Sequence, residues 1–283
     1  DITLADIIFA IIFKSEIVLT NSSKNLISLI NLIYKRKVES VYLVPTTIRR
    51  LISVIEKIGF KYVKSIKQIN SGGETLNIST VNKIRNIFGR INFYNFYGPT
   101  EFTINSTIYK IDLNYKKSEI PIGKILQGIK YFIKKNNNLS KSGELYLAGK
   151  QKMLGYINSK NPFIKVNKID YYPTGDLVKI NQFKELIFLG RNKDYIKHNG
   201  YRINFATISE VISSKIDVNL FLKKKKNKII LYIETSKKTG NTRVKIKKII
   251  NDNLEFYERP DQIKIINKFP TLESGKIDNK KIK

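Results

Sequence analysis

The sequence predicts a mixed α/β protein built from three parts. Residues 1–115 alternate helical patterns with short apolar runs, which is typical of a parallel sheet covered by helices. Residues 116–192 carry short apolar runs separated by Asn, Lys and Gly, which favours a small antiparallel sheet or barrel. Helix and strand patterns resume after that. We therefore expect a small, mobile α+β domain over residues 193–283.

The first part should contain helices that alternate with short strands. Apolar residues at helical spacing predict helices over residues 6–13, 26–34, 47–58 and 79–88. Buried-type apolar runs predict strands over residues 41–44, 66–69 and 91–93. In open α/β sheets, ligands usually bind beyond the carboxyl ends of the strands. We therefore expect a binding site at that edge.

The later parts should contain shorter elements. In the second part, strands are expected at residues 131–133, 144–147 and 186–189. In the third, we expect helices over residues 206–213 and 244–254, a hairpin of residues 218–222 and 229–233, and a strand over 262–266. The basic run from Lys223 to Lys226, with Lys228, is expected to form the solvated turn of that hairpin.

Composition excludes several kinds of chemistry. The chain of 283 residues has no cysteine, which excludes disulfides, thiolate nucleophiles and Cys-based metal sites and suits a cytoplasmic location. The chain has a single histidine, His198, so it cannot form a metal site from several histidines. We expect His198 to be a polar loop residue. The apolar run Ile7–Phe13 is far shorter than the ~20 residues of a membrane-spanning helix. We expect no membrane association.

The net charge of +29 raises the alternative of a basic nucleic-acid-binding protein. The charge comes mostly from lysine, and it is spread along a chain that is also rich in Ile and Asn. A coding bias toward these three residues explains the same composition without a function. We therefore favour the coding bias as the explanation and expect no nucleic-acid binding.

The segment Asn95-Phe96-Tyr97-Gly98-Pro99-Thr100-Glu101 is the most informative in the chain. It follows an apolar run and places a Gly-Pro turn, a hydroxyl and a carboxylate together. A hydroxyl can donate to a phosphate oxygen, and a carboxylate can hold the Mg²⁺ that bridges phosphates. A lone Gly-Pro turn is usually structural. Further segments fit the same chemistry.

Those further segments follow in a characteristic order. Ser71-Gly72-Gly73-Glu74 lets the backbone lie close to a flat group such as adenine. Tyr172-Pro173-Thr174-Gly175-Asp176-Leu177 offers a carboxylate suited to ribose hydroxyls. The others are Gly143 to Tyr156, Gly190 to Asp194 with its continuation to Ile203, and Ser274-Gly275-Lys276-Ile277-Asp278. Each segment alone is weak evidence of function, and it is their order along the chain that is informative.

In that order the segments resemble the adenylate-forming (AMP-binding) superfamily. The chain is most similar to nonribosomal peptide synthetase adenylation domains and D-alanyl carrier-protein ligases. The resemblance implies ATP-dependent formation of an aminoacyl adenylate with Mg²⁺, then transfer to the phosphopantetheine thiol of a carrier protein or domain. An acyl-CoA or aryl-CoA synthetase of the same superfamily is the alternative.

The resemblance also implies roles for individual residues. Lys276 would bridge the substrate carboxylate and the nucleotide, Thr100 would hold the α-phosphate, and Glu101 would hold Mg²⁺. The other nucleotide contacts would be Gly72, Gly73, Glu74, Asn95, Tyr97, Gly98, Asp176 on the ribose, and Arg191. Lys193 would be the hinge, and Lys197 and Gly200 would line the tunnel for the thiol.

Asp1 would bind the α-ammonium of an amino-acid substrate. The rest of its pocket would comprise Ile2, Ala5, Tyr42, Ile69, Ser71, Phe96, Ile104 and Asn105. These residues carry no charge and include bulky rings, so we expect a small uncharged amino acid. Lys193 departs from the Asp that these ligases usually carry at the hinge. The family's phosphate-gripping loop has no counterpart here. We expect the chain to be the C-terminal part of an adenylating enzyme and inactive alone.

Overall fold

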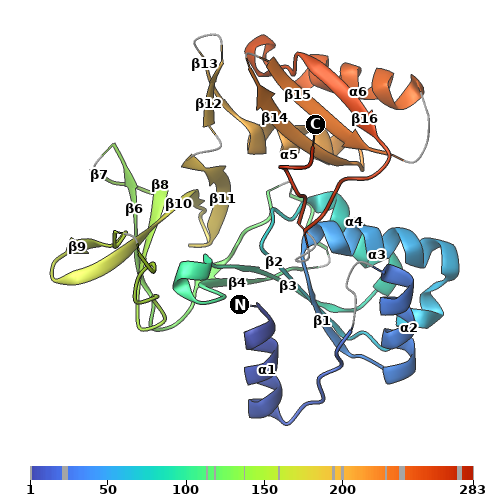
Figure 1. The fold of residues 1–283 in the computed structure, drawn as a ribbon, viewed down its shortest axis with the longest axis horizontal. Helices are drawn as coiled ribbons and strands as arrows, with labels where there is room; N and C mark the ends of the chain where they lie inside the picture. Colours follow the sequence, from blue (N-terminus) through green and yellow to red (C-terminus); the bar gives the residue numbers. More distant parts are fainter. Residues whose placement is uncertain are drawn as a thin grey trace.

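The computed structural model places the chain in two large sheets and a smaller C-terminal domain (Figure 1). It describes residues 2–20, 25–112, 114–117, 119–136, 138–158, 160–192, 195–198, 201–226, 228–235, 240–272 and 276–282. Among these residues, no helix is both long and apolar enough to span a membrane.

The first sheet has the strand order β1-β2-β3-β4-β5. Its strands are β1 (Ser40–Leu43), β2 (Gln68–Gly72), β3 (Asn92–Tyr97), β4 (Thr107–Lys110) and β5 (Lys124–Ile125). The first three run parallel, as predicted, whereas β4 and β5 are antiparallel additions. β3 is longer than expected because pairing with β2 continues to Phe96. Asn95 and Tyr97 therefore lie in the strand, and the turn begins at Gly98.

Helices α2 (Leu26–Arg36), α3 (Pro45–Ile58) and α4 (Ile78–Phe88) pack beside this sheet (Figure 1). Asn25 and Asn77 cap α2 and α4 by accepting hydrogen bonds from the Ser28 and Thr80 amides, and Pro45 occupies the first turn of α3. The apolar faces of the three helices meet the sheet in one core. Its fully buried members include Ile30, Ile33, Ile48, Ile52, Ile55, Ile84 and Phe93. The predicted alternation of helix and strand is thereby confirmed.

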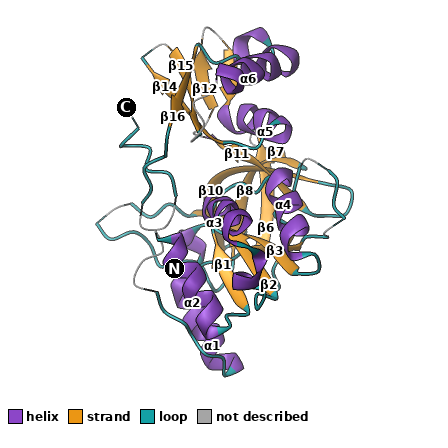
Figure 2. Cartoon of the chain, turned by 90° about the vertical axis from the view of Figure 1, so that its right-hand side faces the viewer, coloured by secondary structure: helices purple, strands orange, loops and turns teal. Residues whose placement is uncertain are grey.

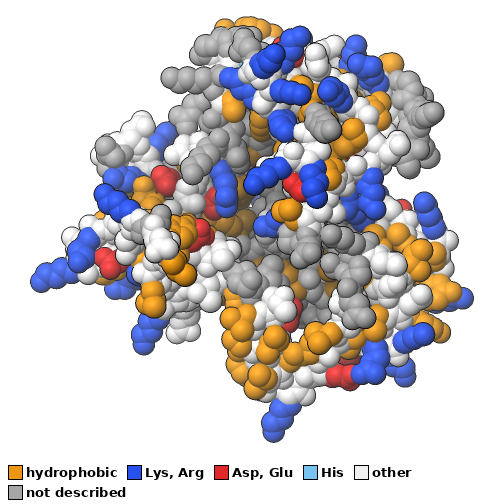
Figure 3. Space-filling view, viewed as in Figure 1, with side chains coloured by type: hydrophobic (Ala, Val, Ile, Leu, Met, Phe, Trp, Pro, Cys, Tyr) orange, Lys and Arg blue, Asp and Glu red, His pale blue; other side chains and the backbone are white. Residues whose placement is uncertain are grey.

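Helix α1 (Ile2–Phe13) differs from the other helices because its apolar side chains remain exposed. At the lower edge of Figure 3, hydrophobic side chains gather where Figure 1 places α1. Large exposed residues of this helix are Leu4, Ile7, Ile8, Phe9, Ile11, Ile12 and Phe13. A contiguous exposed apolar surface of this kind favours association.

The second sheet is antiparallel and has the order β11-β10-β8-β6-β7, with β9 paired to β10. Its strands are β6 (Lys130–Lys135), β7 (Asn138–Leu139), β8 (Ser142–Ala148), β9 (Ile164–Val166), β10 (Ile169–Ile180) and β11 (Leu186–Arg191). The expected small β part is present, but its described strands form an open sheet and not a closed barrel. Its core contains Leu145, Leu147 and Val178 and receives Phe102, from the turn after β3.

The C-terminal domain begins with the hairpin β12 (Tyr195–His198) and β13 (Tyr201–Asn204). It continues through α5 (Phe205–Lys215), β14 (Asn219–Lys225), β15 (Lys228–Glu234), α6 (Gly240–Asn253) and β16 (Gln262–Ile266). In Figure 2 this domain lies above the first sheet, with α5 between α6 and α4.

Two expectations for this domain need correction. The predicted hairpin is confirmed, but Lys223, Lys224 and Lys225 belong to β14 and not to its turn, because they continue the ladder to Ile230, Ile229 and Lys228. His198 is not a loop residue. It lies in β12 with 4% of its surface exposed, and its Nε2 is 3.5 Å from Asp261 Oδ2. His198 lies in a strand because it pairs with Tyr201 at the end of the β12–β13 ladder.

Candidate functional site

A cavity of about 660 Å³ opens where the first sheet, the second sheet and the C-terminal domain meet. Most of the nucleotide contacts named from the sequence line this cavity: Gly73, Glu74, Asn95, Tyr97, Gly98, Thr100, Glu101, Asp176, Arg191 and Lys276. Arg49, Ala206 and Ser213 also line it, although no short motif pointed to them. Residues from both ends of the chain thus meet at one site of a size suited to a nucleotide.

Asp176 forms the most tightly bonded part of the site. The residue is 1% exposed, and its carboxylate accepts a 2.6 Å hydrogen bond from Tyr97 Oη and pairs with Arg191 Nε at 3.0 Å. Burial, with the charge of Asp176, holds the pKa of Tyr97 well above its ordinary value, so the hydroxyl stays a neutral donor. A carboxylate has about four lone-pair sites, so Asp176 can also accept from ligand hydroxyls.

Glu101 lies in the short 3₁₀ helix η2 (Thr100–Phe102) that follows the Gly-Pro turn. Tyr156 Oη donates to Glu101 Oε1 at 2.6 Å. Burial acts to raise the pKa of Glu101, but hydrogen bonding from Tyr156 and Tyr172 and the charge of Arg191 outweigh it and lower the pKa. Sequence reasoning gave Tyr156 no role.

The ionised Glu101 carboxylate is compatible with Mg²⁺. Among the described residues, no group of three or more His, Asp or Glu side chains could hold a metal by itself. Mg²⁺ is commonly held by one or two carboxylates together with substrate phosphates. A single ionised carboxylate beside a nucleotide-sized cavity fits that mode of binding.

Two glycines of the motifs are required because neighbouring atoms occupy the space that a side chain would need. A side chain at Gly98 would overlap the carbonyl of Ile104, and one at Gly72 would overlap the hydroxyl of Tyr42. Gly73 has φ +80°, in the left-handed region that favours glycine. Another residue would therefore not fit at Gly72 or Gly98 unless these neighbours moved.

Other named residues also have structural partners. Asn95 is buried, and its Nδ2 donates to the Pro121 carbonyl at 2.9 Å. Glu74 Oε2 accepts from the Thr46 amide at 2.9 Å and from Thr46 Oγ1 at 2.7 Å, so it caps the first turn of α3. Both still line the cavity, but their side chains also hold neighbouring segments in place.

Lys276 reaches the cavity from the C-terminal segment. A Cβ at Gly73 would lie 3.4 Å from its Cε and 3.5 Å from its Nζ. The Leu272 amide donates to the Lys276 carbonyl at 2.8 Å, and the Asp278 amide donates to the Pro270 carbonyl at 2.8 Å. The paired segment on either side of Lys276 thus directs its ammonium group toward the turn after β2.

The predicted substrate residues lie partly beside this cavity and partly outside it. Tyr42 Oη donates to Asn105 Oδ1 at 3.3 Å, and its ring stacks on Phe96 at 5.7 Å between centroids. Ser71 is fully buried, and Ile69 is part of the first core. Ile104 has φ +67°, a strained conformation for a β-branched residue.

Several named residues lie outside the part of the chain that the structure describes. Asp1, Lys193 and Gly200 are among them, as are the side chains of Ile2, Ala5 and Lys197.

Comparison with known proteins identifies the family of this chain. A family model described as AMP-binding enzyme matches residues 1–157. That match covers more than half of the chain, so the chain belongs to the AMP-binding enzyme family.

Curated relatives include bacitracin synthase 3 from Bacillus licheniformis, 26% identical over an aligned length of 307 residues. The match covers 99% of this chain but 5% of that protein. The chain therefore spans a small part of this relative.

Solved structures share the fold at low identity. O-succinylbenzoate coenzyme A synthetase from Bacillus subtilis, in complex with AMP, has a TM-score of 0.75 and 20% identity, covering 99% of this chain and 58% of that one. A four-domain nonribosomal peptide synthetase bound to AMP and glycine has a TM-score of 0.73 and 22% identity, covering 92% of this chain and 20% of that one. The predicted adenylate-forming fold is thereby confirmed.

Proposed function

We propose that the protein is part of an ATP-dependent ligase that activates an amino acid. The main support is the meeting of Asp176, Glu101 and Lys276 around one cavity, although they come from three separate parts of the fold. Family membership supports the use of ATP. The nonribosomal peptide synthetase bound to AMP and glycine supports an amino acid as the substrate.

In the proposed first step, an oxygen of the amino-acid carboxylate attacks the α-phosphorus of ATP. The bond to the bridging oxygen breaks, pyrophosphate leaves with its electrons, and an aminoacyl adenylate remains. Lys276 would stabilise the negative charge that develops between the carboxylate and the α-phosphate, with Thr100 as a hydroxyl donor. Glu101 would hold Mg²⁺, which neutralises phosphate charge when bound. Asp176 would accept from the ribose hydroxyls.

In the proposed second step, a phosphopantetheine thiol on a carrier protein or domain attacks the acyl carbon, and AMP leaves. Lys193 as the hinge, with Lys197 and Gly200 beside the thiol path, belongs to this proposal. So does the division of the chain at residues 115 and 193. In this proposal the domain reorients between the steps, so that Lys276 serves the first step and the thiol reaches the acyl group in the second.

A coenzyme A synthetase is the second candidate, because such an enzyme shares the fold. The test is ATP–pyrophosphate exchange by the full-length protein with twenty amino acids and a panel of aryl and fatty acids. We expect the strongest exchange with Gly, Ala or Ser. Asp1→Ala should abolish exchange with amino acids, because the α-ammonium loses its charged partner. Preference for an acid without an amino group would favour the coenzyme A synthetase.

A further inference from the structure

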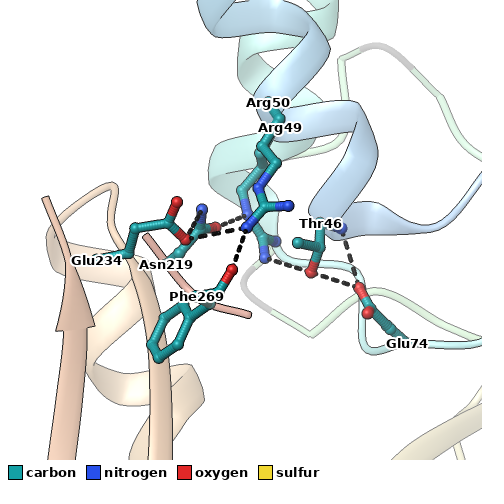
Figure 4. Close-up of polar contacts among 7 residues, drawn as sticks. All are labelled: Thr46, Arg49, Arg50, Glu74, Asn219, Glu234 and Phe269. Atoms are coloured by element: carbon teal, nitrogen blue, oxygen red, sulfur yellow. Dashed lines mark hydrogen bonds and ion pairs between the residues drawn. The ribbon is translucent and has the colours of Figure 1, made fainter. Parts of the chain in front are cut away.

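Two consecutive arginines of α3 reach across to the C-terminal domain (Figure 4). Arg50 Nη2 donates to Glu234 Oε2 and to the Phe269 carbonyl, each at 3.4 Å. Arg49 Nε donates to Asn219 Oδ1 at 2.7 Å. The two guanidinium groups thus bind β14, β15 and the segment after β16.

These contacts belong to a longer network. Within the C-terminal domain, Asn219 Nδ2 donates to Glu234 Oε2 at 3.2 Å, across the β14–β15 pair. On the other side, Arg49 Nη2 donates to Thr46 Oγ1 at 3.3 Å, and Thr46 donates to Glu74. An unbroken series of hydrogen bonds therefore connects the turn that lines the cavity with strands β14 and β15 of the C-terminal domain (Figure 4).

The network is shielded from water. The side chains of Arg50 and Glu234 are 17% and 14% exposed. Burial lowers the pKa of Arg49 from its ordinary value, while the carboxylates of Glu74, Asp217 and Glu234 act in the opposite direction. A buried charge that loses its partner is costly, so either domain leaving this position would have to rehydrate these groups.

The Phe269 carbonyl connects the network to Lys276. The Phe269 ring is buried in a small core with Tyr232 and Ile282. The next residue, Pro270, accepts from the Asp278 amide, which closes the paired segment that carries Lys276. Arg50 therefore binds the base of the segment whose far end places Lys276 against Gly73.

We propose that Arg50, supported by Arg49, is a positioning residue that holds the C-terminal domain where Lys276 reaches the cavity. Arg50 is not among the described residues that line the cavity, so it would act through domain position and not through ligand contact. Its effect on catalysis rests on the proposed function. The effect on domain position does not. The latch, meaning Arg49, Arg50, Asn219, Glu234 and the Phe269 carbonyl, stabilises the adenylating arrangement and must open before thiol transfer.

The first test measures domain position without any substrate. The 283 residues contain no cysteine, so a pair introduced as Lys83→Cys and Asp217→Cys is labelled selectively once any cysteine elsewhere in the full-length protein is replaced by serine. These residues form an ion pair between α4 and the segment before β14, so the two thiols lie within reach of a short bismaleimide. In the full-length protein with this pair, Arg50→Ala should slow cross-linking severalfold. Lys57→Ala, an exposed lysine of the same helix, is the matched control and should leave it unchanged.

The second test separates the two half-reactions. Arg50→Ala should slow pyrophosphate exchange about tenfold or more, the loss expected when one partner of a buried charge pair is removed. Thioester formation from supplied aminoacyl adenylate should be unchanged or faster. Glu234→Ala removes the other partner of the ion pair and should reproduce both effects. It replaces Arg50→Ala in this test if Arg50→Ala lowers the melting temperature. Arg50→Lys, which retains the charge, should recover part of the exchange.

The outcomes distinguish the two proposals. Unchanged cross-linking in both Arg50→Ala and Glu234→Ala would overturn the latch, whatever the activity. Equal losses in both half-reactions would overturn the positioning role of the latch. Slower cross-linking in a parent protein that shows no exchange with any acid would support the latch and overturn the proposed function.

Discussion

The hydroxyl of Tyr97 donates to Asp176 Oδ2 at 2.6 Å and thereby joins the last residue of β3 to the middle of β10. The two residues are 79 positions apart in the chain and belong to different sheets. With Arg191 on the other carboxylate oxygen, this contact fixes the edge of the cavity at which the proposed ribose contact lies.

Removing the Tyr97 hydroxyl should weaken this edge. Tyr97→Phe leaves a buried carboxylate with one donor fewer, so we expect a loss of about 1–3 kcal/mol in the free energy of unfolding. AMP affinity should fall as well, because the Asp176 carboxylate is then held by fewer partners. Denaturant unfolding and calorimetric titration of the full-length protein measure the two effects. Tyr94→Phe, in the same strand, is the control, and equal losses in both variants would contradict the assigned role.

Lys276→Ala should separate the half-reactions. In the proposed function, Lys276 stabilises charge only while the C-terminal domain is closed over the cavity. We expect pyrophosphate exchange to fall by several orders of magnitude, as is typical when a preorganised charge at a phosphoryl centre is lost. Transfer from supplied aminoacyl adenylate should persist. The exposed Lys280 supplies the control variant, and comparable losses in both steps would make Lys276 structural.

Tyr156→Phe should change the pH dependence of Mg²⁺ binding. The pKa of Glu101 lies below its ordinary value of 4.5, and Tyr156 is the largest lowering contribution. A carboxylate whose pKa is lower in the folded than in the unfolded protein stabilises the fold at pH values above its unfolded pKa. That stabilisation is lost as the pH falls through the folded pKa. Without the hydroxyl, the acid limit of Mg²⁺-dependent nucleotide binding should therefore move to higher pH.

This shift is measured by titrating Mg²⁺ with the nucleotide present between about pH 3.5 and 6, a range that includes the ordinary Glu pKa of 4.5. Tyr131→Phe removes an exposed hydroxyl elsewhere on the second sheet and should leave the profile unchanged. An identical profile for Tyr156→Phe would show that Glu101 does not hold the metal.

Tyr42→Ala should broaden the amino acids accepted. Tyr42 fills the space beside Gly72 and is held by Asn105 and Phe96, so the ring restricts the proposed side-chain pocket. Truncation should raise the rate of exchange with Leu or Phe relative to the rate with Ala. The expected rise is roughly 10-fold for each additional side-chain group of the substrate that the enlarged pocket holds. Competition assays with mixed amino acids measure this ratio. Strong exchange of the unaltered protein with Arg, Glu or Trp would refute the expected small substrate.

The 283-residue chain expressed by itself should aggregate and show no measurable pyrophosphate exchange. The apolar surface of α1 is exposed, with Ile12 62% and Phe13 71% accessible. Ile12→Lys with Phe13→Lys should increase the monomeric fraction in size-exclusion chromatography without restoring exchange, because the proposed grip on the β- and γ-phosphates is lacking. Robust exchange with a cooperative melt would mean that another phosphate-binding element lies within these residues.

Local sequence determined most elements and the chemistry at their ends. The 3.6-residue spacing of Ile48, Leu51, Ile52 and Ile55 is sufficient to predict α3, and the order of the glycine-containing motifs is sufficient to indicate the family. Both signals depend on neighbours within a few positions of the chain. The same is true of the hairpin β14–β15, whose two apolar runs are separated by a few residues of the chain.

Tertiary structure decided the contacts between distant segments. No local pattern marks Arg50 as the partner of Glu234, 184 residues away, or gives Tyr156 its bond to Glu101. The burial of His198, the capping of α3 by Glu74 and the open second sheet are of the same kind. Each depends on how sheets and domains pack, and packing brings together groups whose separation along the chain carries no periodic signal.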